Sequence, residues 1–349
     1  MIGGLFLNIL TPDKAQSFSE RRPLSNLPPL TLHGVFTGDY SEAFEKYALD
    51  QMVLREDLRS LKAFMQYRIF GKLDNNGIYL GDSSVYKLET YTDHKQIQYF
   101  TDKLNAVYSK YLERLNVHYA IIPDKNFYMD SEGVPKLDYD FIVNHLYQSL
   151  SNMDEIDLFN VLKSDDYYAT DLHWKQENLQ SVVDHLMMAM GNETKIDFST
   201  YDIHEFHPFY GAYYGQSALS LSPDKLIYLK KPWMEGITVT HLDQMIVSNV
   251  LYDVEKLESI DAYDVFLSGP SAIVEMTNPQ ATTEKELILF RDSFGSSIAP
   301  MLLEAYQKIT LVDLRYIPSD QLGEYIAFEN QDVLFLFSTT VINKGFIIK

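Results

Sequence analysis

Two short segments of the sequence carry residue types that could perform nucleophilic chemistry. In the first, the apolar run 286–290 leads into Arg291, Asp292 and Ser293, and a helix-like pattern follows at once. A serine at a strand-to-helix junction presents its hydroxyl at the end of a sheet, where the N–H groups and dipole of the helix can stabilise an oxyanion. Ser293 is therefore a candidate nucleophile, although such a serine can also be only a helix N-cap.

The second segment places Asp171 two residues before His173. In an extended backbone, side chains at positions i and i+2 point to the same side, roughly 6.5 to 7 Å apart at Cα. We expect Asp171 to orient the imidazole and His173 to act as a general base, with Leu172 directed into the core. Taken alone, an Asp-x-His motif is at least as typical of a structural histidine, or of half a metal site, as it is of a catalytic pair.

Alternating helix-like and strand-like runs surround these two segments. The apolar periodicity predicts helices at residues 40–67, 93–115, 297–307 and 320–328, and strands at 77–80, 117–122, 286–290, 309–314 and 333–337. Helices followed by short buried strands are typical of a parallel sheet with crossover helices. Residues 201–278, rich in Tyr, Gly and Pro, predict loops and short antiparallel strands over one end of that sheet.

Composition excludes several classes of function. The 349 residues are 46% hydrophobic and 13% aromatic, enough for a full core, and their net charge of -20 disfavours binding to nucleic acid or anionic lipid. The chain has no cysteine, which excludes disulfides, thiolate metal sites and a cysteine nucleophile. His204 and His207 are three residues apart without a supporting carboxylate pattern, so we predict no metal site.

The N-terminus predicts an arm ahead of a single domain. Residues 1–10 (MIGGLFLNIL) are too few to span a bilayer, so they can be the end of an anchor or signal sequence, or a first element packed on the body. Residues 11–29 are rich in Pro, Ser and charge and show no periodicity. We therefore divide the chain into an arm of residues 1–30 and one domain of residues 31–349, with an insertion at about 201–280.

The two chemical segments together resemble the DHHW family of the SGNH hydrolase superfamily, which is related to the bacterial alginate O-acetylation proteins. Asp171-Leu172-His173-Trp174 is similar to the motif that names the family, and Arg291-Asp292-Ser293 is similar to its serine segment. Further resemblances extend over nearly the whole chain, at residues 17–24, 122–125, 263–269 and 309–316.

The resemblance implies a fold and a site. The fold would be a three-layer α/β/α sandwich with a mainly parallel central sheet, permuted so that Asp-His precedes Ser, plus a cap or insertion. The catalytic residues would be Ser293, His173 and Asp171. Candidates for oxyanion stabilisation or substrate binding are Gly269, Gly295, Arg315, Tyr213 and Tyr214. For Arg315 a structural ion pair is an equal alternative, and the two tyrosines can also serve packing.

The sequence departs from the family pattern at three places. Leu172 stands at the second position of the DHHW motif. The residue at that position is not the expected general base. Ser268-Gly269-Pro270 stands where the family has Gly-Gly-Asn, and Gly295-Ser296-Ser297 stands where it has Ala-Asn-Ser. Each of the last two changes removes an amide side chain near the nucleophile, and loss of one oxyanion donor can lower the rate by about 10² to 10³.

The predicted function is therefore handling of O-acetyl groups on a cell-envelope or exported polysaccharide, through an acyl-serine and without a cofactor. We expect an O-acetyltransferase; a carbohydrate acetylesterase and a non-catalytic polysaccharide-binding or scaffold protein are the alternatives. By its relatives, the protein would lie outside the cytoplasm, at the cell surface or on the membrane through its N-terminal segment. A membrane-bound, acetyl-exporting acyltransferase would be its partner. The sequence does not specify the polymer, the acyl donor or the oligomeric state.

Overall fold

The computed structural model describes residues 11–17, 19–81, 84–129 and 133–349, and they form two compact units. The larger unit consists of residues 88–168, 172–209 and 225–349, and the smaller one of the described residues up to 87 together with 169–171 and 210–224. The division into an arm of residues 1–30 and one domain stays a prediction. Residues 1–10, to which we assigned a remnant of an anchor, lie outside the described residues.

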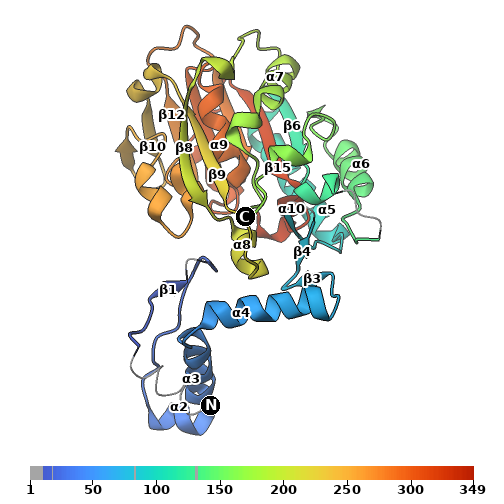
Figure 1. Ribbon diagram of the computed structural model, residues 1–349. Coiled ribbons are helices and arrows are strands. Elements are labelled where there is room, and N and C mark those ends of the chain that lie inside the picture. Colours follow the sequence, from blue (N-terminus) through green and yellow to red (C-terminus); the bar gives the residue numbers. More distant parts are fainter. Residues whose placement is uncertain (1–10, 18, 82–83, 130–132) are drawn as a thin grey trace. The chain divides into compact units, whose positions relative to one another are not determined.

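An eight-stranded sheet forms the centre of the larger unit (Figure 1). Five neighbouring strands run parallel: β14 (Lys308–Val312), β13 (Glu286–Arg291), β15 (Asp332–Ser338), β6 (Asn116–Ile122) and β7 (Asp154–Ile156). The other three strands join the β14 edge in antiparallel pairs, in the order β12 (Ile273–Thr277), β10 (Thr238–His241) and β11 (Ile246–Ser248). The predicted mainly parallel sheet is confirmed.

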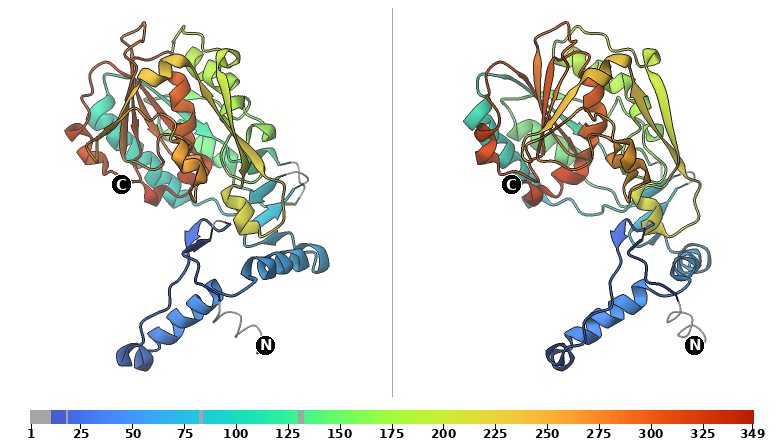
Figure 2. Two further views of the ribbon diagram at one scale, coloured as in Figure 1. Left: turned by 60° about the vertical axis from the view of Figure 1, so that its left-hand side comes forward. Right: turned by 90° about the vertical axis from the view of Figure 1, so that its left-hand side faces the viewer.

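The parallel strands are apolar on both faces because helices cover both. Along β13, Leu287 and Leu289 belong to one hydrophobic cluster, whereas Ile288 and Phe290 belong to the other. The first cluster includes residues of α7 (Gln180–Ala189) and α9 (Ser293–Leu302), and the second includes residues of α5 (His94–Val107), α6 (Tyr139–Ser149) and α10 (Thr339–Ile342). Figure 2 shows these helical layers on opposite sides of the sheet. This arrangement is the predicted α/β/α sandwich.

Three predicted elements differ from the observed ones. The helix predicted at residues 297–307 is α9, which begins four residues earlier, at Ser293. The helix predicted at 320–328 is only a 3-10 helix, Ser319–Glu324. Part of the region 201–278 forms the separate two-stranded sheet of β8 (Asp202–Phe209) and β9 (Asp224–Lys230), but β10, β11 and β12 extend the central sheet itself rather than lie over its end.

The smaller unit contains short helices and strands. Its helices are α2 (Leu32–Thr37), α3 (Asp39–Asp50), α4 (Arg55–Phe64) and α8 (Ala212–Ser217), and a π-helical turn, Met65–Ile69, continues α4. The predicted helix 40–67 is thus divided at residues 51–54. The strands are β1 (Gln16–Ser17) paired with β2 (Arg22–Pro23), and the antiparallel set β3 (Asp74–Asn75), β4 (Ile78–Leu80) and β5 (Val85–Lys87).

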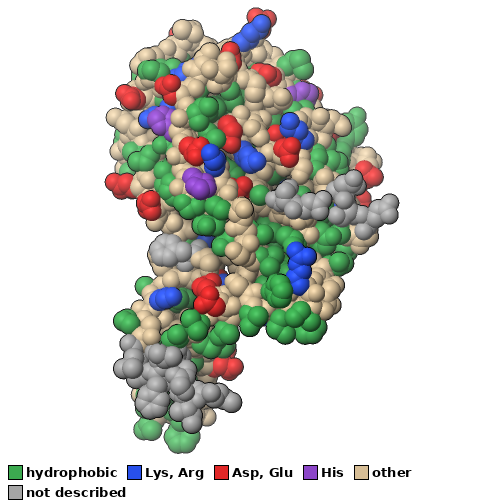
Figure 3. Space-filling view, in the orientation of Figure 1, with side chains coloured by type: hydrophobic (Ala, Val, Ile, Leu, Met, Phe, Trp, Pro, Cys, Tyr) green, Lys and Arg blue, Asp and Glu red, His purple; other side chains and the backbone are tan. Residues whose placement is uncertain are grey.

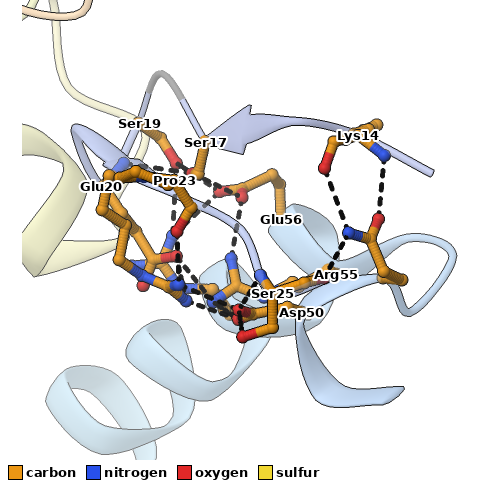
Figure 4. Close-up of polar contacts among 12 residues, drawn as sticks. Lys14, Ser17, Ser19, Glu20, Pro23, Ser25, Asp50, Arg55 and Glu56 are labelled. Carbon is orange, nitrogen blue, oxygen red and sulfur yellow. Dashed lines mark hydrogen bonds and ion pairs between the residues drawn. The ribbon is translucent and has the colours of Figure 1, made fainter. Parts of the chain in front are cut away.

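Many apolar side chains of this smaller unit are exposed (Figure 3). Leu32 and Phe36 on α2 are 81% and 87% exposed, and Leu61 and Phe64 on α4 are more than half exposed. Polar contacts join the segment around β2 to helices α3 and α4 (Figure 4). Within the described residues, no helix has the length and apolar character needed to cross a membrane.

Charged side chains make up the ionic cluster of this unit, which we define as Glu20, Arg22, Asp50, Arg55, Glu56 and Arg59. Arg22 forms a two-point ion pair with Asp50, and the hydrogen bond from Arg22 holds the pKa of Asp50 well below its usual range. Arg55 lies 2.6 Å from a carboxylate oxygen of Glu20. Every basic side chain of the ionic cluster therefore has a carboxylate beside it.

Candidate active site

Ser293 is the first residue of α9 and follows β13 after a single residue, Asp292. The Asp292 carboxylate is fully buried and caps the helix by accepting a hydrogen bond of 3.1 Å from the Phe294 amide. Its other oxygen accepts one of 2.8 Å from the amide of Ser338, at the end of β15. Asp292 thus fixes the turn to the neighbouring strand, and the side chain of the half-buried Ser293 is free of the capping role.

His173 lies on a bent loop and not on the extended strand that we expected. An antiparallel bridge between Tyr167 and Trp174 closes the loop, and the Tyr168 amide donates to the His173 carbonyl at 3.1 Å. The buried ammonium of Lys125 donates to the Tyr168 carbonyl at 2.7 Å. These backbone contacts fix the loop, so the orientation of its side chains follows from the turn and not from strand alternation.

The loop and the helix bring the candidate base and nucleophile together. His173 Nε2 lies 2.8 Å from Ser293 Oγ, a hydrogen-bonding distance. His173 is only 6% exposed, which shields the pair from bulk water. A neutral imidazole that accepts this hydrogen bond is positioned to remove the hydroxyl proton when Ser293 attacks an electrophile.

Tyr263 contacts the imidazole and Ser297 supports Tyr263; neither role follows from the sequence pattern. The Tyr263 ring stacks on the His173 ring, with centroids 3.8 Å apart and planes 7° apart. The Tyr263 hydroxyl donates to Ser297 Oγ at 2.9 Å, and Trp174 Nε1 donates to the same oxygen at 2.8 Å. Ser297, one turn beyond Ser293, therefore links the residue that follows His173 to the ring that stacks on it.

Asp171 is fully buried and belongs to the smaller unit. It accepts a hydrogen bond of 2.7 Å from the Ala212 amide, and Arg21 lies 3.5 Å from the same carboxylate oxygen. Gly211 permits this approach, because a Cβ on Gly211 would lie 2.4 Å from the Asp171 Cβ. Its predicted role toward His173 still rests on the two-residue spacing.

Tyr213 and Tyr214 also belong to the smaller unit. The Tyr213 side chain is buried and its amide donates to the Thr170 carbonyl at 3.0 Å. The Tyr214 ring contacts the Tyr210 ring, with centroids 4.4 Å apart. Both tyrosines therefore have packing contacts of their own, and their role in sugar binding stays a prediction.

A small cavity of about 40 Å³ lies beside Ser293. It contains two of the other predicted site residues, Gly269 and Arg315, and its complete lining is Tyr263, Asp264, Phe266, Gly269, Pro270, Arg291, Ser293, Ser296 and Arg315. The size suits a short acyl group or a single small anion, and it is too small for a sugar ring.

Two glycines predicted as oxyanion donors already use their amides. Gly269 donates to the Phe266 carbonyl at 3.3 Å, and Gly295 donates to the Asp292 carbonyl at 3.0 Å. Gly269 has a φ of +90°, and a Cβ there would lie 2.7 Å from the Asp264 carboxyl carbon. At Gly295 the backbone is helical, and a Cβ would lie 2.5 Å from the Arg291 Cβ. Gly295 thus makes room for the Arg291 side chain.

Arg291 and Arg315 share the buried carboxylate of Asp313 unequally. Arg315 makes a bidentate contact, with Nε at 2.8 Å and Nη2 at 2.6 Å, whereas Arg291 Nη1 lies 3.5 Å away. Burial lowers the pKa of Arg291, and the charge of Asp313 opposes this only in part. For Arg315 the hydrogen bonds and charge of Asp313 outweigh burial and raise its pKa. Arg315 is thus a member of a structural ion pair and also lines the cavity.

The described residues contain no group of three or more His, Cys, Asp or Glu side chains that could hold a metal ion. His204, one of the two histidines considered for such a site, stacks on Tyr228 across β8 and β9, with centroids 5.1 Å apart.

Solved structures with a similar fold exist. A DHHW family protein from Eubacterium siraeum DSM 15702 superposes with a TM-score of 0.62 at 20% sequence identity, over 78% of this chain and 95% of that chain. PatB1 from Bacillus cereus superposes with a TM-score of 0.61 at 18% identity, over 76% and 96% of the two chains, and its structure with a sulfonyl adduct is also similar. At these identities the likeness establishes the fold.

Sequence comparison gives one family match. No curated protein matches the chain significantly in sequence. The family model described as DHHW protein matches residues 141–312, a segment that contains both His173 and Ser293. The predicted resemblance to the DHHW family is thus confirmed over this segment.

Proposed function

We propose that this protein is a serine-dependent acyl-transfer enzyme that acts on O-acetyl groups of a polysaccharide. The observation that carries the proposal is the distance of 2.8 Å between His173 Nε2 and Ser293 Oγ, at the junction of β13 and α9. A nucleophile hydrogen-bonded to a base, beside a small cavity, is the arrangement that acyl transfer through a covalent intermediate requires.

In the proposed first half-reaction, Ser293 Oγ attacks the carbonyl carbon of an acetyl ester while His173 Nε2 takes the hydroxyl proton. The carbonyl π electrons move onto its oxygen, and the Ser293 amide, to which no acceptor is assigned within the described residues, is one donor to that oxyanion. The intermediate then collapses, the bond to the leaving alcohol breaks, and the alcohol departs with the proton from His173. Asp171 is the proposed orienting carboxylate.

The second half-reaction decides between two enzymes. Transfer of the acetyl group from Ser293 to a sugar hydroxyl makes an O-acetyltransferase, which we favour because the family resemblance points to O-acetylation. Transfer to water makes a carbohydrate acetylesterase. The same resemblance supports a cell-envelope or exported polysaccharide as the substrate, a location outside the cytoplasm, and a membrane-bound acetyl-exporting acyltransferase as the partner.

A non-catalytic polysaccharide-binding protein is the second candidate function. Pro270 stands where the family has an asparagine, and the Gly269 amide donates to Phe266, so two donors expected from the family pattern are missing from the cavity. The proposal therefore requires that another group serve the oxyanion.

Turnover of a chromogenic acetyl ester tests the proposal. We expect the wild type to turn over the ester and the variants Ser293→Ala and His173→Ala to be inactive. If the enzyme is a transferase, added oligosaccharides should accept the acetyl group. As a control, Ser199→Ala removes an exposed serine that hydrogen-bonds only to Asp197, and it should retain full activity.

Folded wild-type protein without turnover, tested with several acetyl donors, would favour the binding function. Turnover that survives in Ser293→Ala would place the chemistry elsewhere. A sulfonyl fluoride gives a second readout, because it should label Ser293 in the wild type and leave Ser293→Ala unmodified.

A further inference from the structure

Arg291 has an unusual environment for an arginine. Its side chain is 2% exposed, and two of its guanidinium nitrogens, Nε and Nη2, have no hydrogen-bond partner among the described residues. The third, Nη1, lies 3.5 Å from Asp313, at the outer limit of a hydrogen bond. Buried donors without acceptors destabilise the folded state, and charged donors do so most, so such a group calls for an explanation.

The ion pair with Asp313 does not supply that reason. Arg315 already contacts both oxygens of Asp313, at 2.8 and 2.6 Å, and its own amide donates to Oδ1 at 3.1 Å. Asp313 is therefore satisfied without Arg291. What Arg291 adds at this place is a positive charge and unused N–H groups.

The position of Arg291 relates these N–H groups to the nucleophile. Arg291 ends β13 two residues before Ser293, and both residues line the cavity of about 40 Å³. The stem of Arg291 runs beneath the first turn of α9, where only a glycine at position 295 leaves room for it. The helix that presents Ser293 is thus shaped around the Arg291 side chain.

The same cavity lacks the donors that the family pattern would place there. Pro270 lines it in place of an asparagine and has no N–H group, and the amide of Gly269 donates to Phe266. A site for acyl transfer needs several donors aimed at the developing oxyanion, and preorganised charged donors are the strongest.

We infer that Arg291 is a catalytic residue whose guanidinium group donates to the oxyanion formed on the acyl group at Ser293, in place of the missing amide. This inference rests on the proposed function. As Oγ bonds to the carbonyl carbon, the π electron pair moves to the carbonyl oxygen, and Arg291 and the Ser293 amide stabilise the negative charge. When the intermediate collapses, the pair returns to the carbonyl and the bond to the leaving alcohol breaks, so Arg291 neither gains nor loses a proton.

Arg291→Ala, assayed with the neutral substrate p-nitrophenyl acetate, tests this role. We expect kcat to fall by about 10² to 10³ while KM stays near the wild-type value, since the lost interaction belongs to the transition state. Added guanidinium ion should enter the space vacated by the side chain and restore part of kcat. Arg114→Ala, which removes an exposed arginine of the same unit, is the matched control and should show neither the loss nor the rescue.

Different failures have different meanings. Ser293-dependent turnover that is undiminished in Arg291→Ala would overturn this inference alone. A loss of kcat that added guanidinium does not restore would also overturn it. So would a variant whose only change is a raised KM for anionic esters. If Arg291→Ala does not fold, Arg291→Met preserves the buried volume and leaves Asp313 paired with Arg315, and full kcat in that variant would overturn the inference. A wild type without Ser293-dependent turnover would overturn the proposed function and this inference with it.

Discussion

The region around Ser293 and the ionic cluster of the smaller unit both concentrate polar side chains, but they use them differently. In the ionic cluster each arginine faces a carboxylate, as Arg22 does Asp50 at 2.9 Å. Beside Ser293, Arg291 keeps two buried nitrogens that have no acceptor among the described residues. Paired charges satisfy one another within the local structure, whereas the donors of Arg291 have no such partner, and the role that we infer for them is to stabilise an oxyanion.

The two regions also differ in what their contacts position. The hydrogen bonds of the ionic cluster join the segment around β2 to helices α3 and α4, and none of them orients a nucleophile. Around Ser293, the hydrogen bonds of Tyr263 and Trp174 instead meet at Ser297 Oγ, and the Tyr263 ring stacks on the imidazole of His173. A dense set of ion pairs is therefore weaker evidence of a catalytic site than a small network that fixes a base beside a hydroxyl.

The largest expected effect follows from replacing the base itself. His173→Gln removes the proton acceptor but can retain the hydrogen bond to Ser293, so turnover of p-nitrophenyl acetate should fall by about 10² to 10⁴ with little change in the free energy of unfolding. Steady-state kinetics and denaturant unfolding measure the two quantities. Equal activity in wild type and variant would mean that His173 is not catalytic and that the polar contacts around Ser293 serve structure, as those of the ionic cluster do.

A smaller effect should come from Gly295→Ala. The added methyl would lie 2.5 Å from the Arg291 Cβ, so the arginine or the helix must move, at a cost of about 1–3 kcal/mol in the free energy of unfolding. We also expect a lower kcat, because the shift displaces the guanidinium group. Urea unfolding together with kinetics tests this, and a variant with unchanged stability and activity would show that the close packing of Arg291 has no consequence.

In the ionic cluster, Asp50→Asn should affect stability and not turnover. Loss of the charged contact to Arg22 should cost about 1–2 kcal/mol, which is modest because Arg22 is 36% exposed. Since the pKa of Asp50 is lowered in the folded protein, its contribution is present above the ordinary carboxyl pKa and is lost as the pH falls through the lowered value.

Hydrogen exchange of α3 between neutral and acidic pH measures this contribution. The wild type should lose protection on acidification, and the variant should lose less because its charge is already absent. A large fall in turnover in Asp50→Asn at neutral pH would contradict the assignment of the ionic cluster to structure.

The smallest effect is expected for an exposed pair that belongs to neither region. Lys225 and Glu205 lie 3.0 Å apart, but their side chains are 61% and 42% exposed. Lys225→Ala should change the free energy of unfolding by less than about 0.5 kcal/mol and leave turnover unchanged. A change above about 1 kcal/mol in the free energy of unfolding, measured in urea, would mean that this ion pair is stronger than its exposure indicates.

Much of the fold could be predicted because it depends on local patterns. Buried parallel strands such as β13 and β15 are continuous apolar runs, and the motif around Ser293 stands at the end of one of them. The start of α9 could not be placed, because Ser293, Gly295 and Ser296 are typical of a turn, and the buried Asp292 that caps the helix is recognised only in the structure. The bent backbone at Asp171 and His173 was also hidden, since it depends on distant contacts such as that of Lys125.

The candidate site shows the same division between local and long-range information. Motif resemblance pointed to Ser293 and His173, and the structure places these two side chains in contact. Stacking of Tyr263 on His173 and the link through Ser297 join residues about 90 and 123 positions apart in the sequence, and the unpaired donors of Arg291 depend on burial. No local pattern encodes either feature.

Detection of the acyl-enzyme tests the central claim most directly. Wild-type protein mixed with p-nitrophenyl acetate, quenched in acid and digested, should carry an acetyl group on the peptide that contains Ser293, and tandem mass spectrometry should locate it on that side chain. Ser293→Ala should carry none and should not turn over the ester. Full turnover without acetylation of Ser293, or acetylation that persists at the same level in Ser293→Ala, would contradict the account.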